Sequence, residues 1–376
     1  MEDQSKKTIW LITLADKTNS LHAGIVSKAY AQKEALVNLG YATEMFLLQG
    51  NEIIDQRGKV LNKIYPVAIR FGFFSFLKTK MKNEKKAPDI LYIRYPFTTL
   101  SFLSFLRNVR RNYKTCKTVV EFPTYPYKNE FQGWSKIKYY YDQFLFDFAK
   151  KNIDLAAVIG NKMHISGVKT TFLSNSIKIP EFSPKNNPDK NVFGMLAIGN
   201  WNDWHGLDRV IIGLENYYQN QPYKKVKLHV IGEGNGLQNI KSLVRSKKLE
   251  EHVLFYGKKE EKEIDKICSF CHIGVGVLGI HRKGLNHQSP LKHRYYISRG
   301  LPLFYSTKDD DLSENLPFVF MCEENDDPVA ISEIIEFTKK CPVSSIEIWD
   351  FANDHLRWEG KFIDIFHTLC VHNREH

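Results

Sequence analysis

The sequence predicts an α/β protein of two domains, each built on a doubly wound parallel sheet with helices on both faces. Its 376 residues suit two domains of roughly 100 to 200 residues each. Short apolar runs rich in β-forming residues alternate with helix-like segments, which is typical of parallel sheets. A stretch rich in Pro, Asn and Lys, residues 175–192, interrupts this alternation near the middle of the chain and predicts a linker.

The first half begins with a strand–loop–helix–strand unit. Thr8–Leu14 is an apolar strand, Ile25–Leu39 a helix closed by Gly40, and Tyr41–Leu48 a second strand. Four further strands are expected at Asp89–Arg94, Thr118–Phe122, Ala156–Gly160 and Thr171–Ser174. We therefore assign residues 1–178 to an N-terminal Rossmann-like domain.

A second series of strands and helices follows the linker. The strands are expected at Phe193–Gly199, Val226–Ile231, Val253–Tyr256, Ile273–Leu278 and Leu301–Tyr305. The helices between them are expected at Leu207–Tyr218, Leu237–Ser246 and Glu261–Cys271. This series predicts a second Rossmann-like domain over residues 190–345, followed by a helical tail over residues 346–376.

The charge is concentrated in the first half. Residues 1–180 carry 28 Lys and Arg against 14 Asp and Glu, whereas the remainder carries 25 against 28. The segment 70–86 joins aromatic residues to a run of lysines, which favours peripheral contact with an anionic membrane surface, although a core cluster beside a solvated loop explains it equally well. No nucleic-acid-binding module is recognisable. With no apolar run of membrane-spanning length and no signal-peptide pattern, we expect a cytoplasmic protein at the inner membrane face.

The six cysteines predict neither a disulfide framework nor a metal site. Cys268 and Cys271 form a C-x-x-C pair, but no second pair lies at the spacing that a structural zinc site requires. We expect both to be buried thiols, and we expect no metal and no cofactor.

The segment from Ser289 to Gly300 predicts a helix whose start binds an anion. Ser289 suits the N-cap, Pro290 the first helical position and Gly300 the position after the C-terminus, giving a helix of about ten residues. The free N–H groups of such an end attract phosphate, and Lys292 adds a full charge. The alternative is a well-capped helix whose lysine is only solvated.

The loop Gly279–Gln288 leads into this helix and is basic. It contains Arg282, Lys283 and His287, which suit a diphosphate leaving group, unless the loop is simply a solvated surface segment.

Glycines follow strands at two places, Gly199 and the turn that contains Gly232 and Gly234. They do not form the G-x-G-x-x-G pattern of nicotinamide cofactor sites, and a glycine after a strand is also ordinary at a turn. As candidate donor-binding residues, we expect them to allow close backbone approach to the donor. We expect Gly24 to give the same freedom to the first loop of the N-terminal half.

Glu121–Tyr127 ends a strand, where the ligand-binding crevice of an open α/β sheet lies. We expect Glu121, as a base or anchor, and Tyr125 and Tyr127 to face an acceptor. A rigid turn fixed by two prolines is the alternative.

Several of these motifs, in this order, resemble glycosyltransferase family 4 of the GT-B fold, in particular enzymes of bacterial capsular and surface polysaccharide synthesis. The motifs are Trp204–Arg209, Val230–Gly236, Val253–Gly257, Gly284–Lys292, Gly300–Pro302 and, on the acceptor side, Glu121–Tyr127.

The resemblance implies a retaining, metal-independent transfer from a nucleotide sugar on the second domain to a glycan or lipid-linked acceptor on the first. The candidate catalytic residues are Lys292, Glu121 and His287. The candidate donor-binding residues are Gly24, Gly199, His205, Gly232, Gly234, Arg282, Lys283, Ser289, Pro290 and Tyr295. His287 and Tyr295 stand where the family usually has two glutamates, which leaves a non-catalytic binding subunit or a nucleotide-sugar epimerase as alternatives.

Overall fold

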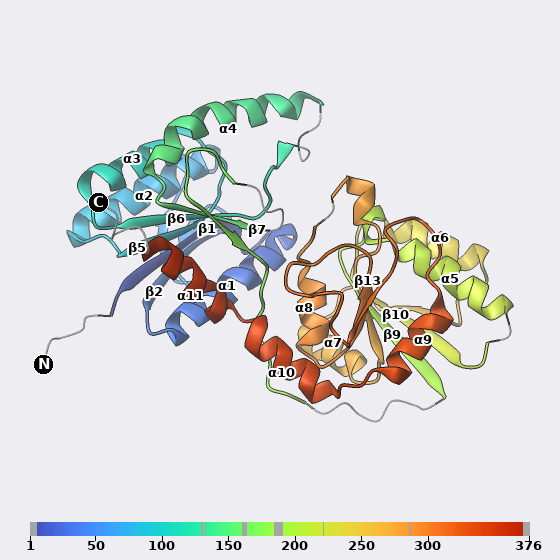
Figure 1. Cartoon of the computed structure of the whole chain (residues 1–376). Coiled ribbons are helices and arrows are strands. Elements are labelled where there is room, and N and C mark those ends of the chain that lie inside the picture. Colours follow the sequence, from blue (N-terminus) through green and yellow to red (C-terminus); the bar gives the residue numbers. More distant parts are fainter. Residues whose placement is uncertain are drawn as a thin grey trace, which may run out of the picture. The chain divides into compact units, whose positions relative to one another are not determined.

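The chain forms two compact units in the computed structural model, which describes residues 6–128, 131, 133–159, 164–183, 191–220, 222–285 and 287–370 (Figure 1). The first unit comprises Met1–Ser174 with Trp358–His376, and the second comprises Asn175–Arg357. The expected helical tail 346–376 is therefore divided between the two units and is not a separate segment. The expected linker falls partly on residues 184–190, outside the described residues.

The first unit is built on a sheet whose described strands have the order β4-β3-β2-β1-β5-β6-β7-β8. These strands are β1 (Thr8–Asp16), β2 (Ala42–Gln49), β3 (Glu52–Ile54), β4 (Val60–Lys63), β5 (Ile90–Arg94), β6 (Lys117–Phe122), β7 (Leu155–Ile159) and β8 (Thr170–Leu173). From β2 to β8 the neighbours pair in parallel, as the sequence predicts. The antiparallel edge formed by β3 and β4 was not predicted, because these strands are short and partly polar.

Helices cover both faces of this sheet. On one face lie α2 (Ile69–Glu84), α3 (Leu100–Asn112) and α4 (Lys136–Ala149), whose buried side chains form one core cluster with the sheet. On the other face α1 (Ala23–Asn38) packs beside α11 (Trp358–Cys370). The buried side chains of this face form a second core cluster, to which Trp358 and Phe362 of α11 belong. The end of the chain thus completes the core of the first unit.

The second unit has the same three-layer construction. Its described strands have the order β11-β10-β9-β12-β13-β14 and pair in parallel throughout. They are β9 (Val192–Ile198), β10 (Lys225–Ile231), β11 (Val253–Phe255), β12 (Ile273–Val275), β13 (Leu303–Tyr305) and β14 (Val319–Met321). One face is covered by α5 (Leu207–Gln219), α6 (Leu237–Ser246) and α9 (Ile331–Lys340), and the other by α7 (Glu261–Cys268), α8 (Leu291–Ile297) and α10 (Ser345–His355).

Candidate functional site

The strand order of the second sheet reverses between β9 and β12. From β9 the chain proceeds outward to β10 and β11, and from β12 it proceeds the other way to β13 and β14. Ligands of open α/β sheets bind beyond the carboxyl ends of the strands at such a switch point. Gly199 and Trp201 follow β9 at this place, and Lys292 reaches it from α8.

Lys292 is the centre of the candidate site. Its Nζ lies 4.6 Å from the centre of the Trp201 ring and 3.4 Å from the position that a Cβ on Gly199 would take. The ammonium is buried and has no hydrogen-bond partner within the described part of the chain. Burial alone lowers the pKa of Lys292 from its ordinary value of 10.5 to about 7. A buried ammonium that lies over a ring face without a hydrogen-bond partner among the described residues is costly, and an anionic ligand would relieve that cost.

His205 lies beside Trp201 and Lys292 and has a neutral side chain. Burial, and then the charge of Lys292, lower the pKa of His205 to about 3. Its Nδ1 lies 3.0 Å from the Asn202 backbone nitrogen and 3.2 Å from the Asn202 carbonyl oxygen. Its ring is 5.5 Å from that of Trp201, measured between centroids. Lys283 lies nearby, with its Nζ 4.5 Å from the centre of the Trp204 ring.

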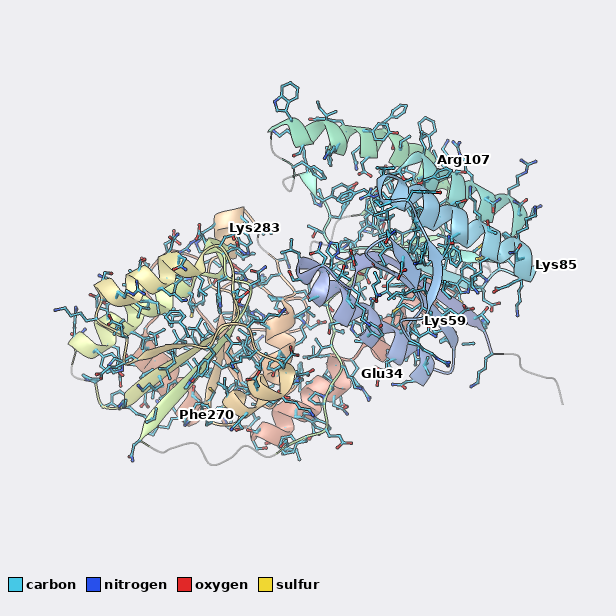
Figure 2. The ribbon with its side chains drawn as sticks, turned by 180° about the vertical axis from the view of Figure 1, so that it is seen from behind. Glu34, Lys59, Lys85, Arg107, Phe270 and Lys283 are labelled. Atoms are coloured by element: carbon cyan, nitrogen blue, oxygen red, sulfur yellow. The ribbon has the colours of Figure 1, made fainter. Side chains whose placement is uncertain are left out.

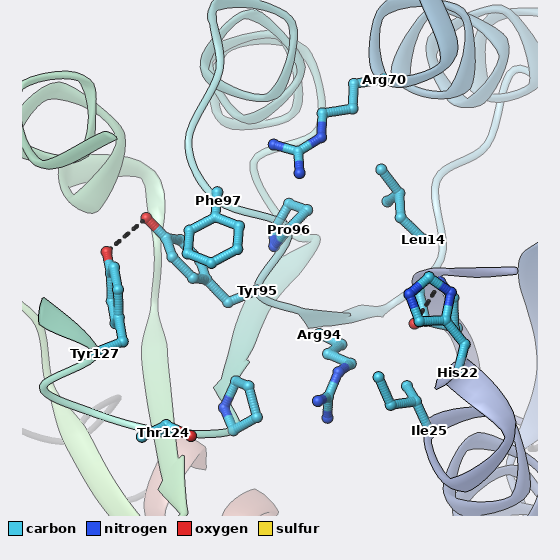
Figure 3. Close-up of a pocket in the computed structure, with 13 residues that line it drawn as sticks. Leu14, His22, Ile25, Arg70, Arg94, Tyr95, Pro96, Phe97, Thr124 and Tyr127 are labelled. Carbon is cyan, nitrogen blue, oxygen red and sulfur yellow. Dashed lines mark hydrogen bonds between the residues drawn. The ribbon is translucent and has the colours of Figure 1, made fainter. Parts of the chain in front are cut away.

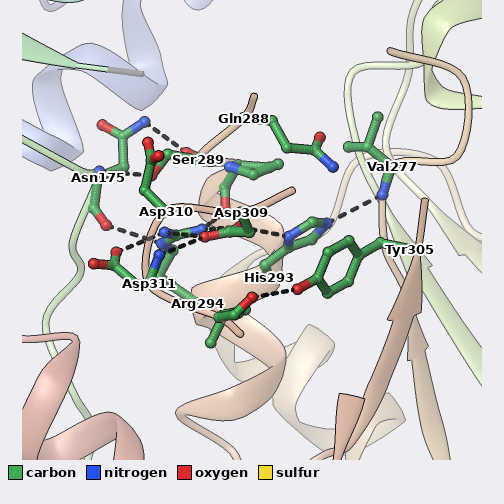
Figure 4. Close-up of polar contacts among 12 residues, drawn as sticks. Asn175, Val277, Gln288, Ser289, His293, Arg294, Tyr305, Asp309, Asp310 and Asp311 are labelled. Atoms are coloured by element: carbon green, nitrogen blue, oxygen red, sulfur yellow. Dashed lines mark hydrogen bonds and ion pairs between the residues drawn. The ribbon is translucent and has the colours of Figure 1, made fainter. Parts of the chain in front are cut away.

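A buried charge network, which sequence reasoning did not find, fixes α8 (Figure 4). The Arg294 guanidinium donates to both carboxylate oxygens of Asp309, to Asp311 at 2.6 Å and to the Asn175 carbonyl at 2.9 Å. His293 Nε2 accepts from the Val277 N–H at 3.1 Å, so its Nδ1–H donates to Asp309 at 2.8 Å. These contacts hold the backbone that carries Lys292.

The start of this helix differs from the prediction. Helix α8 has seven residues and begins at Leu291, with Pro290 in extended conformation at the N-cap and no capping side chain. The Ser289 hydroxyl accepts instead from the Asn175 N–H at 2.8 Å. Ser289 and Pro290 therefore attach the helix to the segment around Asn175, and the helix lacks the serine-capped start that the sequence predicted.

Two other predicted donor-binding residues, Arg282 and Tyr295, contact protein partners. Arg282 makes a two-pronged pair with Asp208 (3.0 and 2.8 Å) and also contacts Asp326, and these carboxylates raise its pKa. Tyr295 donates to Asp265 on α7 at 2.6 Å, away from Lys292. The prediction that both contact the donor is not supported by these contacts.

His287 lies in the loop before α8, with its Nδ1 3.5 Å from an Asp310 oxygen. No other polar contact that would assign it a catalytic role is found among the described residues. Its neighbour Asn286 lies outside the described residues.

The glycines that were expected to approach a ligand approach the backbone instead. A Cβ on Gly232 would lie 1.9 Å from the Gly199 oxygen, and one on Gly234 would lie 2.3 Å from the backbone of Trp201. Both have positive φ. They allow the two loops that follow β9 and β10 to pack together, which places Trp201. Gly24 lies in the first turn of α1 with open space around it.

A pocket of about 310 Å³ opens at the corresponding switch point of the first sheet, between β1 and β5 (Figure 3). Its lining includes two guanidinium groups, Arg70 and Arg94, together with His22 and the aromatic rings of Tyr95 and Phe97. The Arg70 guanidinium lies 5.9 Å from the Phe97 ring, and Phe97 adopts a φ of 60°, which is uncommon for an aromatic residue. Sequence reasoning missed these residues, because nothing local marks Arg70 or Arg94 as pocket residues.

Glu121 positions one of these arginines and is not an exposed base. It is 1% exposed and accepts from Lys28 at 2.9 Å, Arg94 at 3.2 Å, Gln32 at 2.6 Å and Tyr92 at 2.8 Å. Burial would raise its pKa, but these cations and donors outweigh it and lower the pKa to about 2. With its oxygens engaged, Glu121 does not suit the predicted role of general base.

Of the two acceptor-side tyrosines, Tyr127 lines this pocket, whereas Tyr125 is not among its lining residues. The Tyr127 hydroxyl lines the pocket and donates to the buried carboxylate of Asp142, which also accepts from Tyr95 at 2.7 Å. Tyr125 packs beside it, with ring centroids 6.2 Å apart. That Tyr125 and Tyr127 face an acceptor stays a prediction.

No group of three or more His, Cys, Asp and Glu suited to a metal ion is present within the described residues. Cys268 and Cys271 are buried in the core of the second unit, as expected. Over the same described ranges, no helix is both long and apolar enough to cross a bilayer.

A family model matches part of the second unit. Residues 178–275 match the family model of glycosyl transferases group 1, a segment that includes Gly199, Trp201 and His205. Comparison with curated protein sequences gives no match.

Solved structures match over nearly the whole chain. Sucrose-phosphate synthase from Thermosynechococcus elongatus is 12% identical, with a TM-score of 0.65, over 97% of this chain and 99% of that one. A glycosyltransferase from Rickettsia africae is 12% identical, with a TM-score of 0.63, over 98% and 100%. The chain has the GT-B fold. HepE from Anabaena, solved with UDP and glucose, is 15% identical, with a TM-score of 0.57, over 98% and 100%.

Proposed function

We propose that this GT-B protein is a glycosyltransferase that transfers a sugar from a nucleotide sugar to an acceptor. The observation that carries the proposal is the buried ammonium of Lys292 at the switch point of the second sheet, which has no hydrogen-bond partner among the described residues. In sugar transfer the departing group is a nucleoside diphosphate, whose negative charge grows as the glycosidic bond breaks. A cation held in a low-dielectric site stabilises that charge strongly.

The residues around Lys292 have distinct roles in binding the donor. Trp201 contacts the ammonium through its ring face, and neutral His205 offers a ring nitrogen for a hydrogen bond to the sugar or phosphate. Lys283, above Trp204, supplies a second cation for the diphosphate. Metal-independent and retaining transfer follow from the family 4 resemblance of the motifs around these residues.

The acceptor occupies the pocket of the first unit. Its two guanidinium groups and aromatic walls suit a glycan that bears an anionic group, and the resemblance of Glu121–Tyr127 to capsule enzymes supports a lipid-linked glycan of surface polysaccharide synthesis. Such an acceptor places the enzyme in the cytoplasm at the inner membrane face.

A non-catalytic donor-binding subunit is the second candidate. One observation favours it. Tyr295 stands where the family usually has a glutamate, and its hydroxyl is engaged by Asp265 on α7.

The test is a panel of nucleotide sugars examined for release of the nucleoside diphosphate, together with thermal shift of the protein by each compound. Wild type is compared with Lys292→Ala and with Lys262→Ala, which removes an exposed lysine on α7. We expect one donor to be hydrolysed or transferred by wild type and Lys262→Ala, and turnover to fall by on the order of a hundredfold or more in Lys292→Ala. Binding without release would support the non-catalytic subunit. Equal turnover by all three proteins would remove Lys292 from the mechanism, and an epimerised sugar nucleotide would indicate an epimerase.

A further inference from the structure

Helix α4 carries apolar side chains on two opposite faces. Its inner face contributes Leu145, Phe146 and Ala149 to the core of the first unit. Its outer face bears a row of large apolar residues that are between 43% and 62% exposed: Ile137, Tyr140, Tyr141, Phe144 and Phe148. Their spacing of three, one, three and four residues follows one side of a helix.

Trp134 extends this row. It lies just before α4, in a short 3-10 turn, and is 89% exposed. Surface helices of globular proteins normally present a polar face to water. A contiguous row of exposed aromatic residues therefore indicates a surface with a partner.

The charge around the row indicates which partner. Helices α2, α3 and α4 share one face of the sheet and together carry nine Lys and Arg against three acidic residues. Lys136 and Lys138 are exposed in the first turn of α4, beside Ile137. Lys85 follows α2 and Arg107 projects from α3, both on the solvent side of this layer (Figure 2). Exposed Trp and Tyr next to lysines match the chemistry of an anionic membrane interface.

We propose that the outer face of α4, with Trp134, docks on an anionic lipid bilayer. A second copy of this chain is the alternative occupant, which the test below distinguishes. The aromatic residues insert at the depth of the headgroups, and the flanking cations pair with lipid phosphates.

A path of aromatic rings connects this face to the pocket. Phe97 in the pocket is 5.6 Å from Phe131, Phe131 is 5.9 Å from Tyr139, and Tyr139 is 5.5 Å from Tyr140 in the exposed row. Tyr127 in the pocket wall is also 5.6 Å from Tyr139. Docking through α4 thus holds the pocket next to the bilayer surface. This inference rests on the proposed function, because a lipid-linked acceptor requires the enzyme to reach the membrane. Membrane docking is nevertheless tested by vesicle binding and not by enzyme turnover.

The test is co-sedimentation of the full-length protein with vesicles of phosphatidylcholine alone and with vesicles containing phosphatidylglycerol. We expect binding to the anionic vesicles that weakens at high salt, and little binding to the neutral ones. Tyr140→Ser with Phe144→Ser, and separately Lys136→Glu with Lys138→Glu, should each reduce the partition coefficient by on the order of tenfold.

Phe270→Ser is the matched control. Phe270 is an aromatic residue of the second unit that is 38% exposed (Figure 2), so its replacement should leave vesicle binding unchanged. Thermal unfolding of all variants checks that they fold, as expected for exposed positions. The proposal is overturned if anionic vesicles do not bind wild type, if both α4 variants bind as wild type does, or if the exposed aromatics prove to hold a dimer that Phe144→Ser dissociates. A thermal shift of the protein by nucleotide reports on the donor site of the second unit. Failure of membrane docking with a retained nucleotide shift would therefore leave the proposed function standing.

Discussion

Replacing Lys292 with Met should make the ligand-free protein more stable while removing its affinity for a nucleoside diphosphate. The ammonium is buried against Trp201 with no hydrogen-bond partner among the described residues, so the folded chain bears the cost of an uncompensated charge. Met retains the length and the apolar stem of the side chain without that charge.

The size of the effect follows from the pKa of Lys292. A fall from 10.5 to about 7 corresponds, at about 1.4 kcal/mol for each tenfold change, to an upper bound of about 4 to 5 kcal/mol in the free energy of unfolding at pH 7. Because the folded-state pKa is lowered, the unfolded chain binds more protons between pH 7 and 10.5. The free energy of unfolding of wild type therefore rises over that window, and the advantage of the Met variant shrinks as the pH rises.

Urea unfolding at pH 7 and at pH 9.5 measures both quantities, and calorimetry with UDP and GDP measures affinity. Lys262→Met, on the exposed side of α7, is the matched control and should change the free energy of unfolding by less than about 0.5 kcal/mol. A Lys292→Met protein that is less stable than wild type at pH 7, or that binds the nucleotide equally well, would refute the reasoning.

Three further replacements test the residues that hold the Lys292 site and the pocket of the first unit in place. Glu121→Gln should cost about 3 to 5 kcal/mol of unfolding free energy, because it removes the buried negative charge that pairs with Lys28 and Arg94. The lowered pKa of Glu121 further predicts that wild type loses this stability as the pH falls from 4.5 towards 2, and an unchanged acid transition would contradict it. Gly232→Ala should cost about 3 kcal/mol or more of unfolding free energy, since its Cβ would meet the Gly199 oxygen at 1.9 Å. A thermal midpoint equal to that of wild type would show that the loops after β9 and β10 can separate. Asp309→Asn should cost about 3 to 5 kcal/mol by breaking the buried pair with Arg294, measured by urea unfolding, whereas a neutral effect would mean that Asp311 alone suffices.

The sequence predicted the sheets well because their central strands are buried on both faces. Such strands appear as uninterrupted apolar runs, as in Leu155–Ile159, and helix Leu237–Ser246 was found with its bounds because its periodic pattern is bordered by turn residues. The strands β3 and β4 were missed because they are short and partly exposed at the sheet edge.

The candidate site was predictable only in part. Lys292 and His205 stand out through local charge and motif, but the partners of a side chain depend on distant segments. Arg282 is neutralised by Asp208, 74 positions away, and by Asp326, 44 positions away, and neither pairing leaves a local pattern. The exposed row of α4 did have a local signal, its helical spacing, but spacing alone does not distinguish a buried face from an exposed one.

Proton uptake on nucleotide binding tests the central claim most directly. If a diphosphate settles against Lys292, whose pKa is about 7 in the ligand-free protein, binding at pH 8 must protonate the amine. Calorimetry with UDP or GDP at pH 8, in buffers of different ionisation enthalpy, should then show uptake of close to one proton, decreasing towards pH 6.5 as the free amine becomes charged. Binding at pH 8 with no proton uptake, or no binding of any nucleoside diphosphate, would contradict the account.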